Sequence, residues 1–216
     1  MSTIAVMQPY FLPYAGYFRL FAAADRVALL DCVQFPRRGW VHRNQLTGVN
    51  GDPVWLTLPL QPAPRDALIA DLRFADDAEQ SLVERCRRFP ILSDTTLPLV
   101  HALHRPHGDV VDYIAGLLRH CCNALGLPFD TIRTSTLSID PNVRGQDRIL
   151  EIAESLGATR YVNLQGGKAL YDPAVFSAHG IDLNIFDDWQ GSHQSIAERL
   201  LSESAATIAG EIRQQI

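Results

Sequence analysis

Three segments carry the polar and aromatic side chains with which this chain could do chemistry. Residues 8–14 follow a short apolar run at 3–7, residues 31–44 follow a run at 27–30, and residues 163–172 begin at the end of another such run. Short apolar runs are typical of buried strands, and open parallel sheets bind ligands beyond the carboxyl ends of their strands. We therefore expect the three segments to meet at one pocket.

The first segment combines a restrained backbone with ring and amide groups. Its two prolines lower the cost of holding a shaped loop, and Gly16 just beyond it lets a ligand approach the backbone closely. Free N–H groups at the start of the next helix suit an anion. We predict that Gln8 and Tyr14 contact a ligand, whereas Phe11 and Tyr17 fit packing under the sheet equally well.

The second segment begins at Asp31 and then becomes basic. Guanidinium groups can hold phosphate or carboxylate with two hydrogen bonds, and Trp can stack on a base or a sugar. A solvated basic loop is the alternative interpretation. Cys32 with His42 as its base is a candidate nucleophile, although a small buried thiol is the simpler explanation. The predicted ligand-binding residues here are Gln34, Arg38, Trp40, Arg43 and Asn44.

The third segment contains two adjacent glycines followed by Lys168, a pattern that exposes backbone N–H groups beside a positive charge. Such a pattern can hold phosphate or carboxylate. It is not a P-loop, because the glycine spacing and the Ser or Thr after Lys are missing. Together with residues 145–148, which precede a predicted helix, this segment supplies the candidates Gln146, Arg148, Asn163, Gly166, Gly167, Lys168 and Tyr171.

The elements that must position these residues follow from hydrophobic periodicity and turn signals. The opening reads strand, loop, helix, strand, which is a βαβ unit and favours a parallel sheet. We predict an α/β fold with an open, mostly parallel Rossmann-like sheet, helices on both faces and a helical insert at about 78–126, in one domain over 1–216. The predicted strands are 3–7, 27–30, 54–60, 69–74, 129–134, 161–164 and 181–186; the predicted helices are 16–24, 78–88, 94–105, 109–125, 146–156, 173–179 and 193 onward.

Composition narrows the class of protein. A formal charge of −5 argues against broad binding to nucleic acid. The four cysteines match no zinc pattern, and we predict no metal site; three histidines at 101, 104 and 107 lack a carboxylate or cysteine at ligand spacing. No apolar run reaches the length of a membrane span, and the first residues lack the basic region of a signal peptide. We expect a cytoplasmic protein.

Read together, the motifs resemble the WbqC-like protein family over residues 4 to about 200. The first motif, residues 7–18, is long and specific. The other matching residues are Asp31, Val33, Gln34, residues 38–40, Arg43, Asn44, Trp55, Thr57, Pro59, residues 145–150, 156–158, Tyr161, Asn163, residues 166–168, 170–172, Gly180 and Ile181.

The resemblance implies aminoacyl transfer, with glycyl transfer as one case, to an amino group on a sugar nucleotide or natural-product intermediate, as in O-antigen biosynthesis. It supplies no agreed catalytic residues. We predict Asp31 as the base or amine-binding group, with Tyr14 and Lys168 as the other catalytic residues. The acyl donor would be an amino acid activated with ATP and Mg²⁺, an aminoacyl-tRNA or a carrier protein. Two departures from the family pattern are Cys32, where a second Asp is usual, and His42, where Asn is commoner.

The opening strand, Pro-x-x-Gly and second strand also look like the start of the HIGH-motif nucleotidyltransferases, with Tyr14 and Tyr17 in place of their phosphate-binding histidines. This likeness implies nucleotide binding. It gives one alternative function, a nucleotidyltransferase acting on a phosphorylated sugar or cofactor precursor. A non-catalytic sugar-nucleotide-binding protein is the other alternative.

Overall fold

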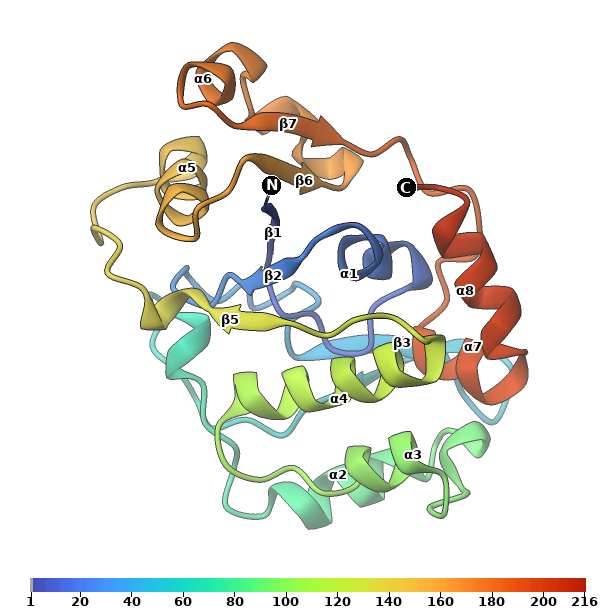
Figure 1. Ribbon diagram of the computed structural model, residues 1–216. Coiled ribbons are helices and arrows are strands. Elements are labelled where there is room, and N and C mark those ends of the chain that lie inside the picture. Colours follow the sequence, from blue (N-terminus) through green and yellow to red (C-terminus); the bar gives the residue numbers. More distant parts are fainter. Residues whose placement is uncertain (1) are drawn as a thin grey trace.

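The centre of the protein is a parallel sheet of five strands, seen in a computed structural model that describes residues 2–216 (Figure 1). The strands lie in the order β5-β2-β1-β6-β7, and every neighbouring pair is parallel. Their bounds are β1 Thr3–Met7, β2 Arg26–Leu29, β5 Thr131–Arg133, β6 Arg160–Asn163 and β7 Asp182–Ile185. The α/β fold with a Rossmann-like parallel sheet, predicted from the sequence, is confirmed.

The strand order places a topological switch beside β1. The chain runs outward from β1 to β2 and β5, and then returns to the other side of β1 with β6 and β7. In open sheets of this kind, ligands bind where the order reverses, beyond the carboxyl ends of the strands. The segments that follow β1 and β6 therefore flank the expected ligand crevice.

Side-chain alternation divides the core into two layers, because successive residues of a strand face opposite sides of the sheet. Val27 and Leu29 of β2 join one hydrophobic cluster, and Ala28 joins the other. Helices α5 (Gly145–Ser155) and α6 (Pro173–Ala178) contribute to the second cluster. In Figure 1 they lie to the left of the sheet.

The opposite face is covered by helices from both ends of the chain. They are α1 (Arg19–Ala23), preceded by a 3-10 turn at Ala15–Phe18, with α4 (Val110–Leu125), α7 (Ile196–Ser202) and α8 (Ala205–Arg213). Helices therefore cover both faces, as expected from the sequence.

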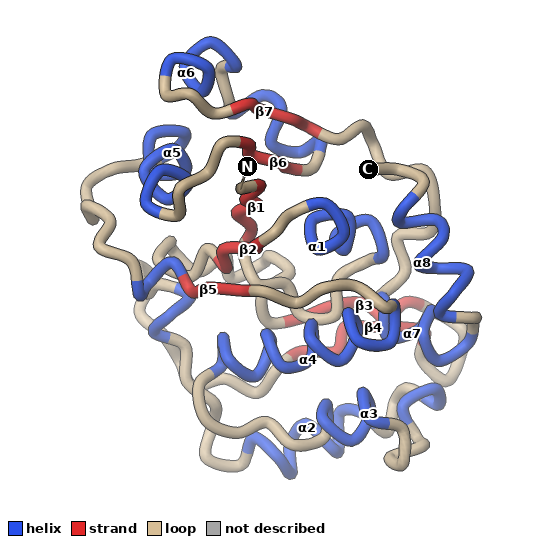
Figure 2. The backbone as a smooth tube through the Cα atoms, viewed as in Figure 1, coloured by secondary structure: helices blue, strands red, loops and turns tan. Residues whose placement is uncertain are grey.

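Between β2 and α4 the chain forms an antiparallel hairpin and two short helices. The hairpin pairs β3 (Arg43–Thr47) with β4 (Pro53–Thr57) and stands apart from the main sheet (Figure 2). Helices α2 (Ala78–Cys86) and α3 (Pro98–Leu103) follow. Their buried side chains belong to the cluster that includes Val27, Leu29 and α4; α3 packs on α4 and α2 packs on β4, so this region extends that layer away from the sheet (Figure 1).

Two elements differ from the sequence prediction. The prediction of a strand at 69–74 is wrong, because the chain forms a 3-10 turn at Ile69–Asp71. The carboxylate of Asp71 accepts a hydrogen bond from the N–H of Leu68 and stabilises this turn. The strand β3 was not predicted, because its sequence Arg-Asn-Gln-Leu-Thr alternates between half-buried polar and buried positions rather than between polar and apolar residues. No helix within residues 2–216 is both long enough and apolar enough to cross a membrane.

Candidate active site

The segment after β1 is held in one conformation by hydrogen bonds to its backbone. Leu12 has a φ of +49°, a left-handed conformation that is rare for a bulky residue and is often found at functional sites. The Tyr17 hydroxyl donates to the carbonyl of Gln8 at 2.8 Å, and the N–H of Phe11 donates to the carbonyl of Trp40 at 2.9 Å. A loop fixed in this way can present side chains to a ligand with little loss of entropy on binding.

Two buried residues from distant parts of the chain complete this scaffold. Asn44, at the start of the hairpin, donates through Nδ2 to the carbonyls of Phe11 and Leu12. Ser195, before α7, donates through Oγ to the carbonyl of Leu12 at 2.8 Å. The N–H of Ile196 donates to the carbonyl of Pro13 at 2.8 Å. The strained turn is therefore held by the hairpin on one side and by the α7 region on the other.

The pinned loop forms one wall of a pocket of about 310 Å³, which we call the aromatic pocket. This volume lies at the small end of the range for small-molecule sites. Tyr14 stacks on His193 with ring centroids 4.9 Å apart, and Trp40 is 44% exposed. The lining residues are Tyr10, Pro13, Tyr14, Trp40, Asn44 and His193.

Four of these side chains carry polar atoms that are free to bind a ligand. Within residues 2–216, no hydrogen bond engages the hydroxyls of Tyr10 and Tyr14, the Nε1 of Trp40 or the ring nitrogens of His193, whereas the Asn44 amide is fully used. Burial raises the pKa of both tyrosines, so each remains a neutral phenol able to donate a hydrogen bond.

A buried tryptophan supports the pocket from behind. The Trp189 ring packs so closely on Gly16 that a Cβ there would come within 2.7 Å of it. Arg19, 1% exposed, lies over the same ring with its guanidinium carbon 5.6 Å from the centroid. Tyr14 meets Trp189 edge to face at 6.5 Å. Gly16 is thus required for close packing, rather than for the ligand approach predicted from the sequence.

A second cavity, of about 630 Å³, lies at the carboxyl ends of β2 and β5, and we call it the strand-end cavity. The apolar side chains Val33, Leu68, Leu137 and Ile139 form much of its wall. Its polar lining residues are Cys32, Gln34, Asp66, Thr134, Ser135, Arg144 and Arg148. The segment after β2 contributes to both cavities, through Cys32 and Gln34 at its start and Trp40 near its end.

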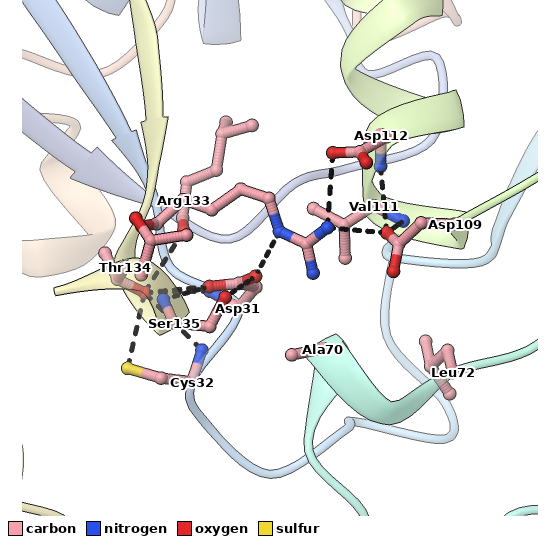
Figure 3. Close-up of polar contacts among 12 residues, drawn as sticks. Asp31, Cys32, Ala70, Leu72, Asp109, Val111, Asp112, Arg133, Thr134 and Ser135 are labelled. Carbon is pink, nitrogen blue, oxygen red and sulfur yellow. Dashed lines mark hydrogen bonds and ion pairs between the residues drawn. The ribbon is translucent and has the colours of Figure 1, made fainter.

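Asp31, whose side chain is 0% exposed, bonds to residues that line the strand-end cavity, Thr134 and Ser135 (Figure 3). Its Oδ2 accepts hydrogen bonds from Nε of Arg133 at 2.8 Å and from the Ser135 hydroxyl at 2.6 Å. Its Oδ1 accepts from the Ser135 N–H at 2.7 Å and the Thr134 hydroxyl at 3.1 Å. Four hydrogen bonds saturate the carboxylate, which therefore faces the protein rather than either cavity.

Arg133 extends this network to the start of α4. Its Nη1 donates to Asp109 at 2.8 Å and to Asp112 at 3.2 Å, while Asp109 also caps α4 by accepting from the N–H groups of Val111 and Asp112 (Figure 3). One guanidinium therefore joins the ends of β2 and β5 to α4. The network fixes Thr134 and Ser135, which line the strand-end cavity.

Arg148, in the first turn of α5, lines the strand-end cavity but uses its donors within the protein. Its guanidinium donates to the carbonyls of Cys32 at 2.8 Å, Val143 at 2.8 Å and Pro141 at 3.1 Å. Arg43 is likewise occupied, because it donates to the carbonyl of Arg38 and lies 4.1 Å from the Trp55 ring centroid. Arg148 therefore shapes the strand-end cavity, and both arginines spend donors on backbone carbonyls.

The thiols divide into a core set and one residue at the cavity. Cys86, Cys121 and Cys122 are buried, and burial raises the pKa of Cys86 and Cys121 to about 12. Cys32 is half-buried, with its Sγ 3.3 Å from the Thr134 hydroxyl. His42 packs against Phe35 and has a buried Nδ1 without a hydrogen-bond partner in residues 2–216.

The segment after β6 is built around Asn163, which is 4% exposed. Its Nδ2 donates to the hydroxyls of Tyr161 at 2.9 Å and Tyr171 at 3.1 Å. A Cβ at Gly167 would lie 2.8 Å from the Tyr171 ring, so this glycine permits close packing. Gly166 and Lys168 are exposed beside it. Gln146 accepts a hydrogen bond from the N–H of Asp172 and so ties α5 to this segment.

The predicted residues do not gather around one pocket: five of them line one of the two cavities, and the other ten line neither. Tyr14, Trp40 and Asn44 line the aromatic pocket, and Gln34 and Arg148 line the strand-end cavity. Neither cavity is lined by Gln8, Asp31 or Lys168. The predicted residues that lie outside both linings are Gln8, Asp31, Arg38, Arg43, Gln146, Asn163, Gly166, Gly167, Lys168 and Tyr171.

Several lining residues were missed by sequence reasoning. His193 lies in a polar stretch after β7 with no strand-end signal of its own, and Ser135 and Arg144 precede α5 in a segment of low hydrophobicity. Tyr10 lies within the first predicted segment, and its aromatic ring alone was a sufficient signal to predict it as a ligand-binding residue. No cluster of three or more His, Cys, Asp or Glu side chains placed to hold a metal occurs in residues 2–216.

Comparison with known proteins agrees with the motifs. The model of the WbqC-like protein family matches residues 8–195, so the chain belongs to that family. The chain is also 24% identical, over 196 residues, to a protein of Mycobacterium tuberculosis (strain ATCC 25618 / H37Rv) that is named "Uncharacterized protein Rv1507c". That similarity covers 87% of this chain and 83% of the relative. No solved structure matches the chain significantly.

Proposed function

We propose that this protein is an amide-forming transferase or ligase. It joins an aminoacyl group, with glycyl as the simplest case, to an amino group on a sugar nucleotide or natural-product intermediate. The observation that carries this proposal is the aromatic pocket: a small, preorganised site beside the switch point, walled by rings whose polar atoms are free.

An amino sugar matches this lining. The apolar face of a pyranose stacks on aromatic rings, and its hydroxyl and amino groups need donors and acceptors at the ring edges. Trp40 offers an exposed ring face, and Tyr14 and His193, which stack on each other, offer their polar ring edges. The acceptor sugar is therefore assigned to the aromatic pocket.

The strand-end cavity is assigned to the activated aminoacyl group. Asp66 supplies a carboxylate for an ammonium group. Arg144, exposed at the start of α5, donates through Nη1 to the carbonyls of Pro141 and Val143, and its Nε and Nη2 remain for a carboxylate or phosphate. The segment from Cys32 to Trp40 contributes lining residues to both cavities. Donors to be compared are glycine with ATP and Mg²⁺, an aminoacyl-tRNA and a carrier-protein thioester.

The predicted catalytic residues take separate roles in this proposal. Asp31 is saturated and buried, so we assign it to positioning Ser135 rather than to proton transfer. The neutral Tyr14 phenol is suited to donate a hydrogen bond to the developing oxyanion. Lys168 and Arg38, both exposed, are assigned to the phosphates of the sugar nucleotide.

The experiment is an amide-formation assay with purified protein, an amino-sugar nucleotide and each of the three donors, read by mass spectrometry. We expect product with one donor, a raised KM for the sugar in Trp40→Ala, and a raised KM for the donor in Asp66→Asn. Absence of product with all three donors, over amino-sugar and other amine acceptors, would contradict the proposal. Sugar-nucleotide binding without turnover would instead identify a non-catalytic binding protein.

A second candidate is a nucleotidyltransferase, which the sheet order favours. The sheet order reverses between β1 and β6, so the loop after β1 and the segment with Gly166, Gly167 and Lys168 follow neighbouring strands, at the position where nucleotide phosphates bind in doubly wound sheets. This function requires pyrophosphate release that depends on a phosphorylated acceptor and not on an amino acid. The same protein preparation can be tested for that release.

A further inference from the structure

His193 is held in the aromatic pocket by contacts on both sides of it in the sequence. The Trp189 indole donates through Nε1 to the carbonyl of Ser192 at 3.1 Å, and the N–H of Gln194 donates to the Ser192 hydroxyl at 3.1 Å. Directly after it, Ser195 is 1% exposed and bonds the carbonyl of Leu12. The backbone that carries His193 is therefore tied to the same turn that carries Tyr14.

The imidazole is oriented by stacking and has both nitrogens available. Its plane lies 28° from that of Tyr14, with centroids 4.9 Å apart. A stacked ring keeps its nitrogens at the edge, and within residues 2–216 neither takes part in a hydrogen bond or an ion pair. The other side chains of the pocket are two neutral phenols, an indole, a proline and an occupied amide. None of these can accept a proton near neutral pH.

We infer that His193 is the general base of the amide-forming step, an inference that rests on the function proposed above. Imidazole is the side chain best matched to proton transfer near neutral pH. His193 contacts the amino group of the sugar bound in the aromatic pocket, and Tyr14 beneath it holds the ring in the orientation required.

In the amide-forming step the amine of the sugar displaces the leaving group of the acyl donor. The amine nitrogen attacks the carbonyl carbon of an activated acyl donor, which is an ester, a thioester or a mixed anhydride. A C–N bond forms, and the nitrogen becomes positively charged. His193 takes one proton from this nitrogen, the C–O or C–S bond to the leaving group breaks with its electron pair, and the amide remains. The imidazolium then returns its proton to the leaving group or to water.

The test compares the wild type with His193→Gln and His193→Ala in the amide assay. We expect kcat to fall by about 10²- to 10⁴-fold in His193→Gln while the KM of the sugar changes little, because general-base catalysis contributes factors of this size. Added imidazole should restore part of the kcat of His193→Ala by occupying the vacated space. A residue that only shaped the pocket would change KM and would not be rescued.

The matched control is His120→Gln, which changes an exposed histidine on α4 outside both cavities. It should keep the kcat of the wild type. Turnover by the wild type together with an unchanged kcat in His193→Gln would overturn the role of His193 and leave the proposed function standing. Loss of kcat in His193→Ala without any response to imidazole would also overturn it. Absence of turnover by the wild type with every donor and acceptor would overturn the proposed function and this inference together.

Discussion

Tyr14 and His193 come from opposite ends of the chain, yet their rings stack with centroids 4.9 Å apart. The contact depends on Leu12, whose carbonyl receives hydrogen bonds from both Asn44 and Ser195. The hairpin, the β1 loop and the α7 region thus meet at one strained turn. A pocket assembled in this way is sensitive to changes in residues that never touch the ligand.

Asn44→Leu tests that assembly. It removes the donor to the buried carbonyls of Phe11 and Leu12, and an unsatisfied buried polar group costs about 1–3 kcal/mol. We expect a loss of this size in the free energy of unfolding, measured by urea denaturation, and weaker binding of an amino-sugar nucleotide. Asn123→Ala, at an exposed site on α4, should leave both quantities unchanged. Equal free energies of unfolding and equal ligand affinities in the two variants would show that Asn44 does not hold the turn at Leu12.

Gly16→Ala and Gly116→Ala form a pair with opposite expected effects. A Cβ at Gly16 would come 2.7 Å from the Trp189 ring, and overpacking of this kind costs about 1–3 kcal/mol. A Cβ at Gly116 meets nothing within 4 Å, and Gly→Ala inside a helix stabilises by about 0.5–1 kcal/mol. Thermal unfolding should show a lower Tm for the first variant and a higher Tm for the second. A Tm at or above that of the wild type in Gly16→Ala would show that Trp189 does not pack tightly on Gly16.

Asp31→Asn distinguishes a positioning role from a catalytic one. Breaking a buried ion pair by removing one charge costs about 3–5 kcal/mol, so we expect a large loss of stability. Asp182→Asn breaks the exposed pair with Arg160 and should change stability little. If folded Asp31→Asn protein kept its kcat, the base would lie elsewhere, as we propose. An unchanged free energy of unfolding together with a loss of kcat of several orders of magnitude would instead identify Asp31 as the catalytic base.

The buried His42 should make the free energy of unfolding depend on pH in the acid range. Burial, and then the positive charge of Arg43, lower the pKa of His42 from 6.5 to about 4. Between these two values the unfolded chain binds a proton that the folded chain does not, so the free energy of unfolding falls as the pH drops from 6.5 to 4. In His42→Asn this part of the fall should disappear, measured by urea denaturation across the window. His120→Asn serves as the exposed control; the same acid loss in all three proteins would contradict the environment described for His42.

The sequence predicted the sheet well because its strands are short apolar runs that end at recognisable turns. Thr3–Met7 matched its predicted bounds, and the other four strands of the sheet lay within their predicted ranges or within one residue of them. The polar strand Arg43–Thr47 was not predicted, because its burial depends on pairing with β4 and not on an apolar sequence pattern.

The site was predicted only in part, because its key contacts join residues distant in sequence. Asp31 looked available at a strand end, but the partner that saturates it, Arg133, lies 102 positions away. Likewise, Ser195 reaches Leu12 across 183 positions and brings His193 to Tyr14. Residue type and local spacing carry no signal for such pairings. They did identify Tyr14, Trp40 and Asn44, whose segments adjoin strand ends.

A crystal structure of the protein soaked with an amino-sugar nucleotide would show directly where the acceptor sugar binds. We expect the sugar ring in the aromatic pocket, stacked against Trp40 or Tyr14, with its amino group within hydrogen-bond distance of a ring nitrogen of His193. A sugar ring bound in the strand-end cavity, or an empty aromatic pocket in crystals whose ligand binds elsewhere, would contradict the assignment of the acceptor site.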